Sequence, residues 1–165
     1  MTRQWAIVMG LCLGMLGCGY SPEGVYDEQY QTVAVPIFEN RTFWDRVQFD
    51  LTEAVTKELE QRTPYKVAPS AVADTILQGS ITSVDQRHLA RRQDGGVPEE
   101  MEITIRVDFE WIDLRTGRTL RARQGFEAVG RYAPTRPAGE RVETAQHAAV
   151  QQLARDIIST LRADW

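Results

Sequence analysis

The stretch that decides the fold of this chain is 101-MEITIRVDFEW-111. Its odd-numbered residues, from Met101 to Trp111, are all apolar, and the even-numbered residues between them are polar or charged. Successive side chains of a β-strand point to opposite faces of the sheet, so this alternation predicts a strand with one buried face. A turn at Leu114–Gly117 leads to another predicted strand, Arg118–Tyr132, and the two would form an antiparallel hairpin.

Two further strands are predicted on the N-terminal side of this hairpin. Thr32–Ile37 alternates in the same way, although Pro36 cannot donate to a ladder and marks an edge or the strand's end. Asp74–Asp85 places Leu77, Gly79 and Ile81 on one side. Tyr65–Ala68 is a candidate for a short fifth strand.

Two amphipathic helices complete the set of elements. The first is predicted over Arg46–Gln61, capped by Asp45 and stopped by Pro64. The second is predicted over Glu140–Arg162. Their apolar stripes recur at helical spacing, at Val47, Leu51, Val55 and Leu59 in the first helix and at Val142, Ala145, Ala149, Leu153, Ile157 and Leu161 in the second.

This order of elements predicts an α+β fold in a single domain. Half-apolar strands and amphipathic helices bury their apolar sides most simply as a mixed or antiparallel sheet of four or five strands, with both helices on one face. The other sheet face would stay free. The predicted division is 1–17 as a signal peptide, 18–30 as a lipidated N-terminus and tether, and 31–165 as the α+β domain.

The N-terminus predicts secretion and lipid attachment. Arg3 precedes an apolar run from Trp5 to Leu16, which is shorter than the roughly 20 residues that span a bilayer and is typical of a signal peptide. Met15-Leu16-Gly17-Cys18 resembles a bacterial lipobox, in which the cysteine is acylated and becomes the new N-terminus. The alternative is an ordinary signal peptide with an incidental cysteine. Cys18 is therefore the predicted lipidation site.

Composition argues against nucleic-acid binding and against catalysis. The chain has a formal net charge of −4, which suits neither DNA nor RNA. It contains none of the common hydrolase, zinc-protease or phosphate-loop motifs. Its two histidines, His88 and His147, read as surface and helix-flank residues. We expect no enzyme activity, no metal and no cofactor.

Three stretches resemble the LPS-assembly lipoprotein family, LptE. These are Cys18-Gly19-Tyr20 at the predicted mature start, 33-VAVPIFENRT-42, and 73-ADTILQGSI-81. The resemblance implies a sheet with two helices, anchored at the inner leaflet of the outer membrane. It also implies a β-barrel partner of the LptD type, which the family plugs, and assistance to lipopolysaccharide (LPS) on its way to the surface.

Related lipoproteins offer an alternative interpretation. A strand that ends in Phe-Glu-Asn-Arg-Thr also occurs in the curli-secretion-like and penicillin-binding-protein-activator families. Such a protein would face the periplasm and dock onto a secretion pore or a cell-wall synthase. The Cys18-Gly19-Tyr20 start and the short mature chain favour the LPS family.

Arginines on the polar face of the predicted hairpin are candidates for binding LPS phosphates, because guanidinium binds phosphate through paired donors. The simplest register places Trp111 opposite Leu120 and pairs Glu110 with Arg121 and Asp108 with Arg123. Arg106 would then face Gly125, and Arg131 would lie near the strand end, so neither would have a partner. We therefore predict that Arg106 and Arg131 contact phosphate; the alternative is an ordinary solvated face.

The loop before the first helix carries candidate partner-facing residues. Aromatic side chains concentrate binding energy at interfaces, but they also staple helix ends to a core. Both interpretations stay open for the loop, whose candidates are Phe38, Asn40, Arg41, Phe43 and Trp44. Partner binding is expected over Phe38–Trp44, Arg87–Pro98 and Ala133–Gly139, together with the polar sheet face.

Overall fold

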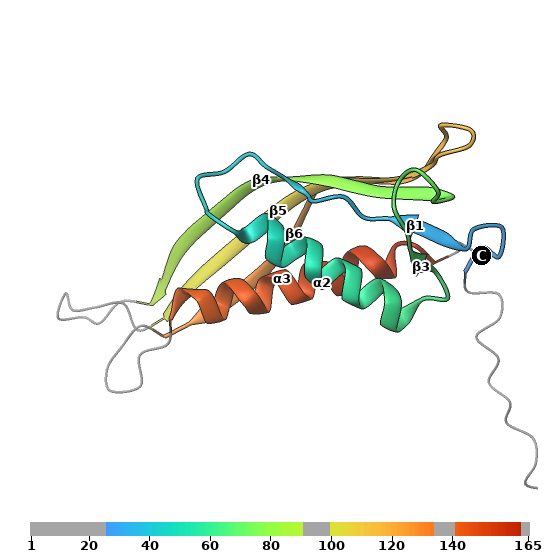
Figure 1. Ribbon diagram of the computed structural model, residues 1–165. Helices are drawn as coiled ribbons and strands as arrows, with labels where there is room; N and C mark the ends of the chain where they lie inside the picture. Colours follow the sequence, from blue (N-terminus) through green and yellow to red (C-terminus); the bar gives the residue numbers. More distant parts are fainter. Residues whose placement is uncertain (1–25, 91–99, 134–140, 163–165) are drawn as a thin grey trace, which may run out of the picture.

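The computed structural model describes residues 26–90, 100–133 and 141–162. A single mixed sheet lies over two helices that cover one of its faces (Figure 1). The predicted α+β class and the one-sided helix layer are confirmed. The predicted lipidation site Cys18, the predicted signal peptide, and most of the partner-binding segments predicted over Arg87–Pro98 and Ala133–Gly139 lie outside the described residues.

The sheet has six strands rather than four or five. Three antiparallel strands dominate it: β4 (Thr75–Ala90), β5 (Glu100–Asp113) and β6 (Thr119–Tyr132). The short strands β1 (Thr32–Ala34) and β2 (Glu39–Asn40) both run parallel to β4, and β3 (Lys66–Val67) pairs with β1 at the edge. The order is β3-β1-β4-β5-β6.

The extra strand arises where the sequence predicted one strand and then a loop. The strand expected over Thr32–Ile37 stops at Ala34, before Pro36, which has no N–H to donate. The chain then returns to the same neighbour, because Glu39 and Asn40 pair with Ser80 and Ile81 of β4. The candidate strand at Tyr65–Ala68 is confirmed as β3.

Both helices lie close to their predicted positions. Helix α2 (Val47–Arg62) follows Arg46, whose φ of 69° places it in the left-handed region, and no side chain caps this end. The predicted cap by Asp45 is therefore wrong. Thr63 is extended before Pro64 and ends α2, as expected for a residue that precedes proline. Helix α3 (Val142–Ser159) buries Ala145, Ala149, Leu153 and Ile157.

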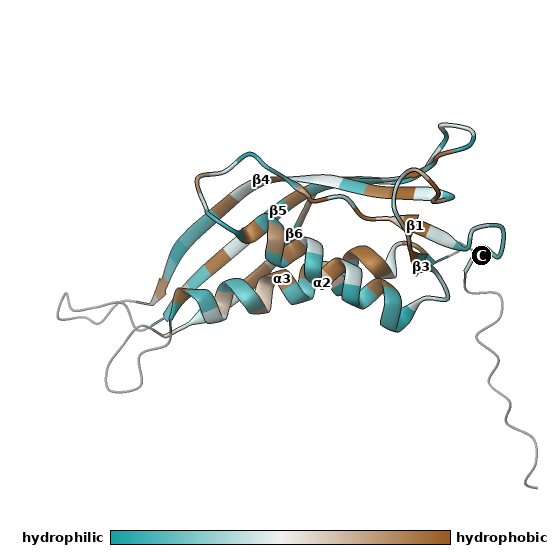
Figure 2. Cartoon of the chain, in the orientation of Figure 1, coloured by the Kyte–Doolittle hydropathy of each residue, from teal (hydrophilic) through white to brown (hydrophobic). Residues whose placement is uncertain are grey.

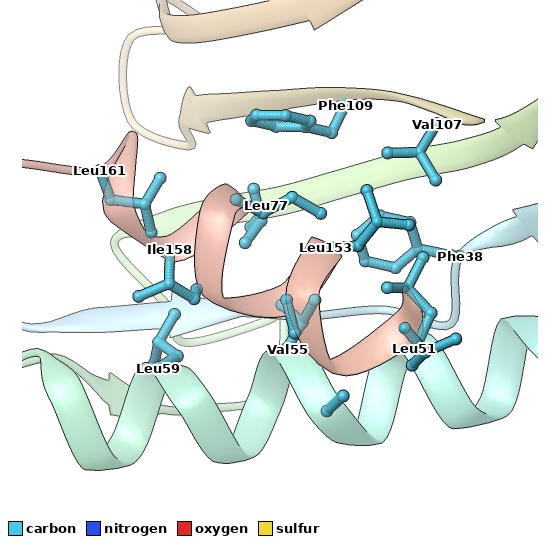
Figure 3. Packing of buried hydrophobic residues seen from close by; sticks show 14 of the residues in the cluster. Phe38, Leu51, Val55, Leu59, Leu77, Val107, Phe109, Leu153, Ile158 and Leu161 are labelled. Atoms are coloured by element: carbon cyan, nitrogen blue, oxygen red, sulfur yellow. The ribbon is translucent and has the colours of Figure 1, made fainter. Parts of the chain in front are cut away.

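The core fills the space between the helices and the sheet. Phe38, Leu51, Leu77, Phe109 and Leu153 come from five different segments and point toward one another there (Figure 3). On β5, the predicted alternation holds along the strand, with Ile103, Ile105 and Val107 fully buried. Figure 2 shows the resulting mixture of apolar and hydrophilic segments along β4 and β5.

The end of the predicted tether belongs to the domain. Tyr30 is 2% exposed, and its hydroxyl donates to Asp113 over 3.3 Å. The Tyr26 hydroxyl donates to the Arg62 carbonyl, and its ring packs edge-on against Tyr65. Burial raises the pKa of Tyr65 to about 12. These aromatic contacts fix residues 26–30 to the domain, so a free tether can include only residues before Tyr26.

Candidate functional site

The loop between β1 and α2 is built around the side chain of Asn40. Its amide nitrogen donates to the Trp44 carbonyl over 2.7 Å and to the Gln48 side chain over 3.0 Å. Its amide oxygen accepts from the N–H and the hydroxyl of Thr42. Asn40 therefore uses all of its hydrogen-bonding capacity to shape the loop, so we assign it a structural role in place of partner contact.

The aromatic side chains of this loop fall into two groups: some pack into the core, and one is exposed to solvent. Phe38 is 1% exposed and packs in the core, and Trp44 is partly buried against the same core. These two side chains fit the core-lid alternative, so neither is presented at the surface as a free anchor. Phe43 is different, because it is fully exposed at 106%. It is the loop aromatic that stands available to a partner.

Arg41 lies beside this loop on the outer surface. Its guanidinium forms a 2.8 Å ion pair with Glu39, which raises the pKa of Arg41 and lowers that of the Glu39 carboxyl. Both side chains are mostly exposed. Together with Asp108, Glu110 and Arg123 they line a groove of about 600 Å³ on the outer sheet face. The acidic residues outnumber the basic ones there, so the groove is a poor site for phosphate.

The β5–β6 register differs from the predicted one. It begins as expected at the turn, with Ile112 opposite Thr119, but two irregularities on β6 shift it by a residue each. The second lies between Phe126 and Arg123, next to Gly125, whose φ of 62° is left-handed and suits glycine. The first, between Ile112 and Trp111, places Trp111 opposite Arg121 and Phe109 opposite Arg123.

The two shifts together give Arg106 a partner that the sequence did not predict. Arg106 opposes Glu127, to which it is ion-paired at 2.7 Å, and it also donates to the Ser83 hydroxyl over 3.2 Å. Its side chain is still 42% exposed. The premise that Arg106 faces Gly125 without a partner was wrong, because Gly125 lies in the bulge, where its N–H donates to Asp108.

Arg131 also has an acidic neighbour across the ladder. It opposes Glu102, and their charged atoms lie 3.6 Å apart. Glu102 is 8% exposed and opposes Arg87 of β4 on its other side. The row Arg87–Glu102–Arg131 thus crosses three strands. Arg131 remains 64% exposed, so its guanidinium is still accessible from solvent.

The ladder does not place the pairs predicted nearer the turn opposite each other, because Arg121 opposes Trp111 and Arg123 opposes Phe109. Glu110 accepts a hydrogen bond from Gln78 over 2.7 Å, and Arg121 donates to the Leu120 carbonyl. Sequence reasoning missed Glu102 and Glu127 as the residues that neutralise the arginines. Gly125 could have indicated one of the register shifts from the sequence, since an isolated glycine in a strand pattern often marks a bulge.

The described residues offer few other groups that could form a catalytic or metal site. His88 and His147 are both exposed, as predicted. No cluster of three or more metal-ligating side chains occurs in the described ranges. Neither of the described helices is both long and apolar enough to cross a bilayer.

The fold places this chain in a class of small α+β domains that includes several lipoproteins. A Chlamydia trachomatis protein, CT253, has a similar fold with a TM-score of 0.59 at 10% identity, over 80% of this chain and 95% of that one. Lipoprotein B of Nitrosomonas europaea is similar at 0.52 and 18% identity, over 87% and 92%. A minor lipoprotein of Acinetobacter baumannii is similar at 0.50 and 15% identity, over 82% and 99%.

Sequence comparison gives the particular family. The lipopolysaccharide-assembly (LptE) family matches residues 30–161, which is nearly all of the described domain. This chain belongs to that family, so the resemblance noted in the sequence is confirmed. The family takes part in LPS assembly and is generally non-enzymatic. No curated protein matches the chain significantly.

Proposed function

We propose that this protein is a lipid-anchored component of LPS assembly at the outer membrane, where it binds a β-barrel partner of the LptD type. The observation that carries the proposal is family membership over residues 30–161. The one-sided helix layer supports it, because it leaves the sheet face with Arg106 and Arg131 available. Barrel interiors are polar, so a largely polar exterior suits a protein seated in one.

Lipid attachment at Cys18 and delivery to the outer membrane are part of this proposal. Cys18 follows Leu16-Gly17, and Gly19 is not the aspartate that retains lipoproteins in the inner membrane. Two acyl chains would hold the protein firmly, whereas one alone binds reversibly. Cys18→Ser should abolish metabolic palmitate labelling. Labelling that persists in this variant, or fractionation of the parent with the inner membrane, would contradict the proposal.

Partner binding is tested by affinity capture from membranes that express the tagged protein. Co-purification of an LptD-type barrel is the expected result. Recovery of a secretion pore or a cell-wall synthase, without the barrel, would replace this proposal with the alternative drawn from the sequence.

We further propose that Arg106 and Arg131 contact LPS phosphates, in competition with their carboxylate partners. Each arginine keeps guanidinium donors accessible beside its ion pair, since its side chain is 42% or 64% exposed. Replacing both with Ala should weaken LPS binding by about tenfold or more, since a charge-assisted hydrogen bond contributes roughly 1.5–3 kcal/mol.

A matched pair of variants separates phosphate binding from a purely structural role. Glu102→Gln and Glu127→Gln remove the competing charges and leave the arginines in place, so they should strengthen LPS binding. If Arg106→Ala/Arg131→Ala binds LPS as the parent does and stays folded, these arginines are not phosphate contacts. The barrel proposal would still stand, because its own capture experiment tests it.

A further inference from the structure

One end of the domain gathers the start of the described chain and two exposed turns. We call it the near end: residues 26–30, the β3–β4 turn at 69–73 and the β5–β6 turn at 114–118. Figure 1 shows these segments together at the end where the described chain begins. The Tyr30 hydroxyl donates to the Asp113 carboxylate beside the β5–β6 turn. The Leu114 N–H of that turn donates to the backbone carbonyl of Asp74, beside the β3–β4 turn, over 2.9 Å. The near end is therefore one connected surface.

Two large apolar side chains stand exposed on the near end. Val72, on the β3–β4 turn, is 73% exposed, and Leu114, on the β5–β6 turn, is 41% exposed. The hydrogen bond from Leu114 to Asp74 brings the two turns side by side. Neighbouring turns that both expose an aliphatic side chain form a small apolar tip, which has an energetic cost in water.

Basic side chains surround this tip. Arg115 and Arg118 lie on the β5–β6 turn and are exposed, and Lys66 is exposed on β3. The Arg115 guanidinium lies 3.9 Å from the Asp113 carboxylate, which is a weak contact. Asp27 and Glu28 are the exposed acidic residues nearby. An apolar tip with a basic rim fits a surface of anionic headgroups, into which the aliphatic groups can dip.

The carboxylates within the two turns are already engaged by the protein. Asp74 accepts from the Gln31 N–H, the Thr32 N–H and the Thr32 hydroxyl. Asp113 is 1% exposed and accepts from Tyr30 and from the Arg115 N–H. Both carboxylates are directed into the fold, so they repel an approaching anionic surface less strongly than two exposed carboxylates would.

The length of the preceding chain places the near end close to the anchor. Cys18 and Tyr26 are eight residues apart, so a fully extended chain joins them over at most about 28 Å. The opposite end of the sheet, where β4 ends and β5 begins, lies about 40 Å further along the strands. A lipid at Cys18 would thus keep the near end within about 28 Å of the bilayer, whereas the tether sets no such limit for the opposite end.

We propose that the near end is a membrane-contact surface, in which Val72 and Leu114 enter the headgroup layer and Arg115 and Arg118 bind lipid phosphates. This inference rests on the proposed lipid anchor at Cys18. The anchor supplies a high local concentration, so a contact too weak to bind membranes alone can still orient the domain. The opposite end, with Arg131, would then point away from the inner leaflet.

The test measures which end of the domain contacts lipid when the full mature chain is attached to vesicles through an artificial anchor. A hexahistidine tag replaces Cys18, which leaves no cysteine in the mature chain, and nickel-chelating lipid holds the protein on phosphatidylethanolamine–phosphatidylglycerol vesicles. A fluorophore is attached at Val72→Cys or Leu114→Cys. The matched controls, Leu89→Cys and Val129→Cys, are 41% and 43% exposed in the parent and lie toward the opposite end.

Quenching by nitroxide-labelled lipid should be about fivefold stronger at positions 72 and 114 than at 89 and 129. Arg115→Gln/Arg118→Gln should at least halve the quenching at position 114, whereas Arg87→Gln/Arg141→Gln should leave it unchanged. Equal quenching at both ends, or stronger quenching at 89 and 129, would overturn the inference. Because the anchor is artificial, this result is independent of palmitate labelling and barrel capture, which test the proposed function.

Discussion

At the scale of single residues, Asn40 shows how one side chain organises the loop before α2. Its amide group joins Thr42, Trp44 and Gln48, which lie on both sides of the loop's tip. The position of Phe43 between Thr42 and Trp44 means that Asn40 also fixes the segment that presents this exposed ring. Asn40, which the sequence suggested as a partner contact, holds the loop before α2 in place.

Asn40→Ala should destabilise the domain by about 1–3 kcal/mol, because the groups that Asn40 satisfies lose their partner. Thermal or urea unfolding of the purified domain measures this. Arg41→Ala is the matched control next to it; it removes only an exposed ion pair and should leave the free energy of unfolding almost unchanged. Equal losses for the two variants would show that Asn40 does not organise the loop.

Asp74 makes the stability of the domain sensitive to acid. The N–H of Gln31, the hydroxyl of Thr32 and the N–H of Thr32 lower the pKa of Asp74 below its ordinary value of 3.8. The unfolded chain therefore binds a proton more readily than the native protein does. The stabilisation is present above the ordinary pKa and is lost as the pH falls through the lower, native value.

Asp74→Asn should consequently flatten the loss of stability on acidification. The parent should lose unfolding free energy as the pH falls below about 4, and the variant should lose less over the same range. Urea unfolding at several pH values provides the comparison. Parallel pH profiles for parent and variant would assign the acid sensitivity to other carboxylates.

At the scale of elements, β6 is the strand whose irregularities matter most. Its two register shifts decide which residues of β5 and β6 face each other, and they place Glu127 beside Arg106. Closer to its C-terminal end, β6 packs directly against α3. A Cβ atom added at Gly130 would clash with the Ala145 carbonyl oxygen, so the absence of a side chain allows this close approach of strand and helix.

Gly130→Ala should therefore cost at least about 1–3 kcal/mol, because strand and helix backbones must separate to admit the methyl group. Val129→Ala, at the exposed neighbouring position, should stay within about 0.5 kcal/mol. Thermal unfolding of both variants tests the contact. A Gly130→Ala protein as stable as the parent would mean that α3 can shift without loss.

The two faces of β5 should respond differently to truncation. Ile105 is fully buried under the helices, so Ile105→Ala should cost about 2–5 kcal/mol. Thr104 lies on the outer face, and Thr104→Ala should cost under about 0.5 kcal/mol. Glu102 is not a suitable control on that face, since it is buried between arginines. Similar losses at positions 104 and 105 in urea unfolding would contradict a one-sided sheet.

At the scale of the whole molecule, stability and recognition lie on different surfaces. The helices cover one sheet face and create the core, while the other face, the turns and Phe43 remain exposed. Substitutions on the exposed surfaces can therefore change binding without unfolding the domain.

Phe43→Ala should reduce recovery of the barrel partner in affinity capture by about tenfold, as loss of an aromatic anchor commonly does. Its unfolding midpoint should match that of the parent, because the ring is fully exposed. The matched control is Phe49→Ala on α2, where the ring is 52% exposed. Unchanged capture by Phe43→Ala would remove the loop aromatic from the proposed interface.

The sequence by itself determined the elements and their layers. Alternation from Met101 to Trp111 defined β5, Pro64 located the end of α2, and the stripe through Leu153 and Ile157 defined the buried face of α3. These features follow from local periodicity and backbone stereochemistry, which neighbouring residues alone express. Three stretches, at 18–20, 33–42 and 73–81, together also indicated the family before any contact was known.

Only the tertiary structure decided which side chains meet across strands. The two register shifts on β6 together change the partner of Arg106 from Gly125 to Glu127, and the burial of Tyr30 joins a predicted tether to the core. A register depends on every insertion along both strands, and a segment's burial depends on surfaces distant in sequence. Neither quantity is a local property, so periodicity could place the arginines on a face but could not assign their partners.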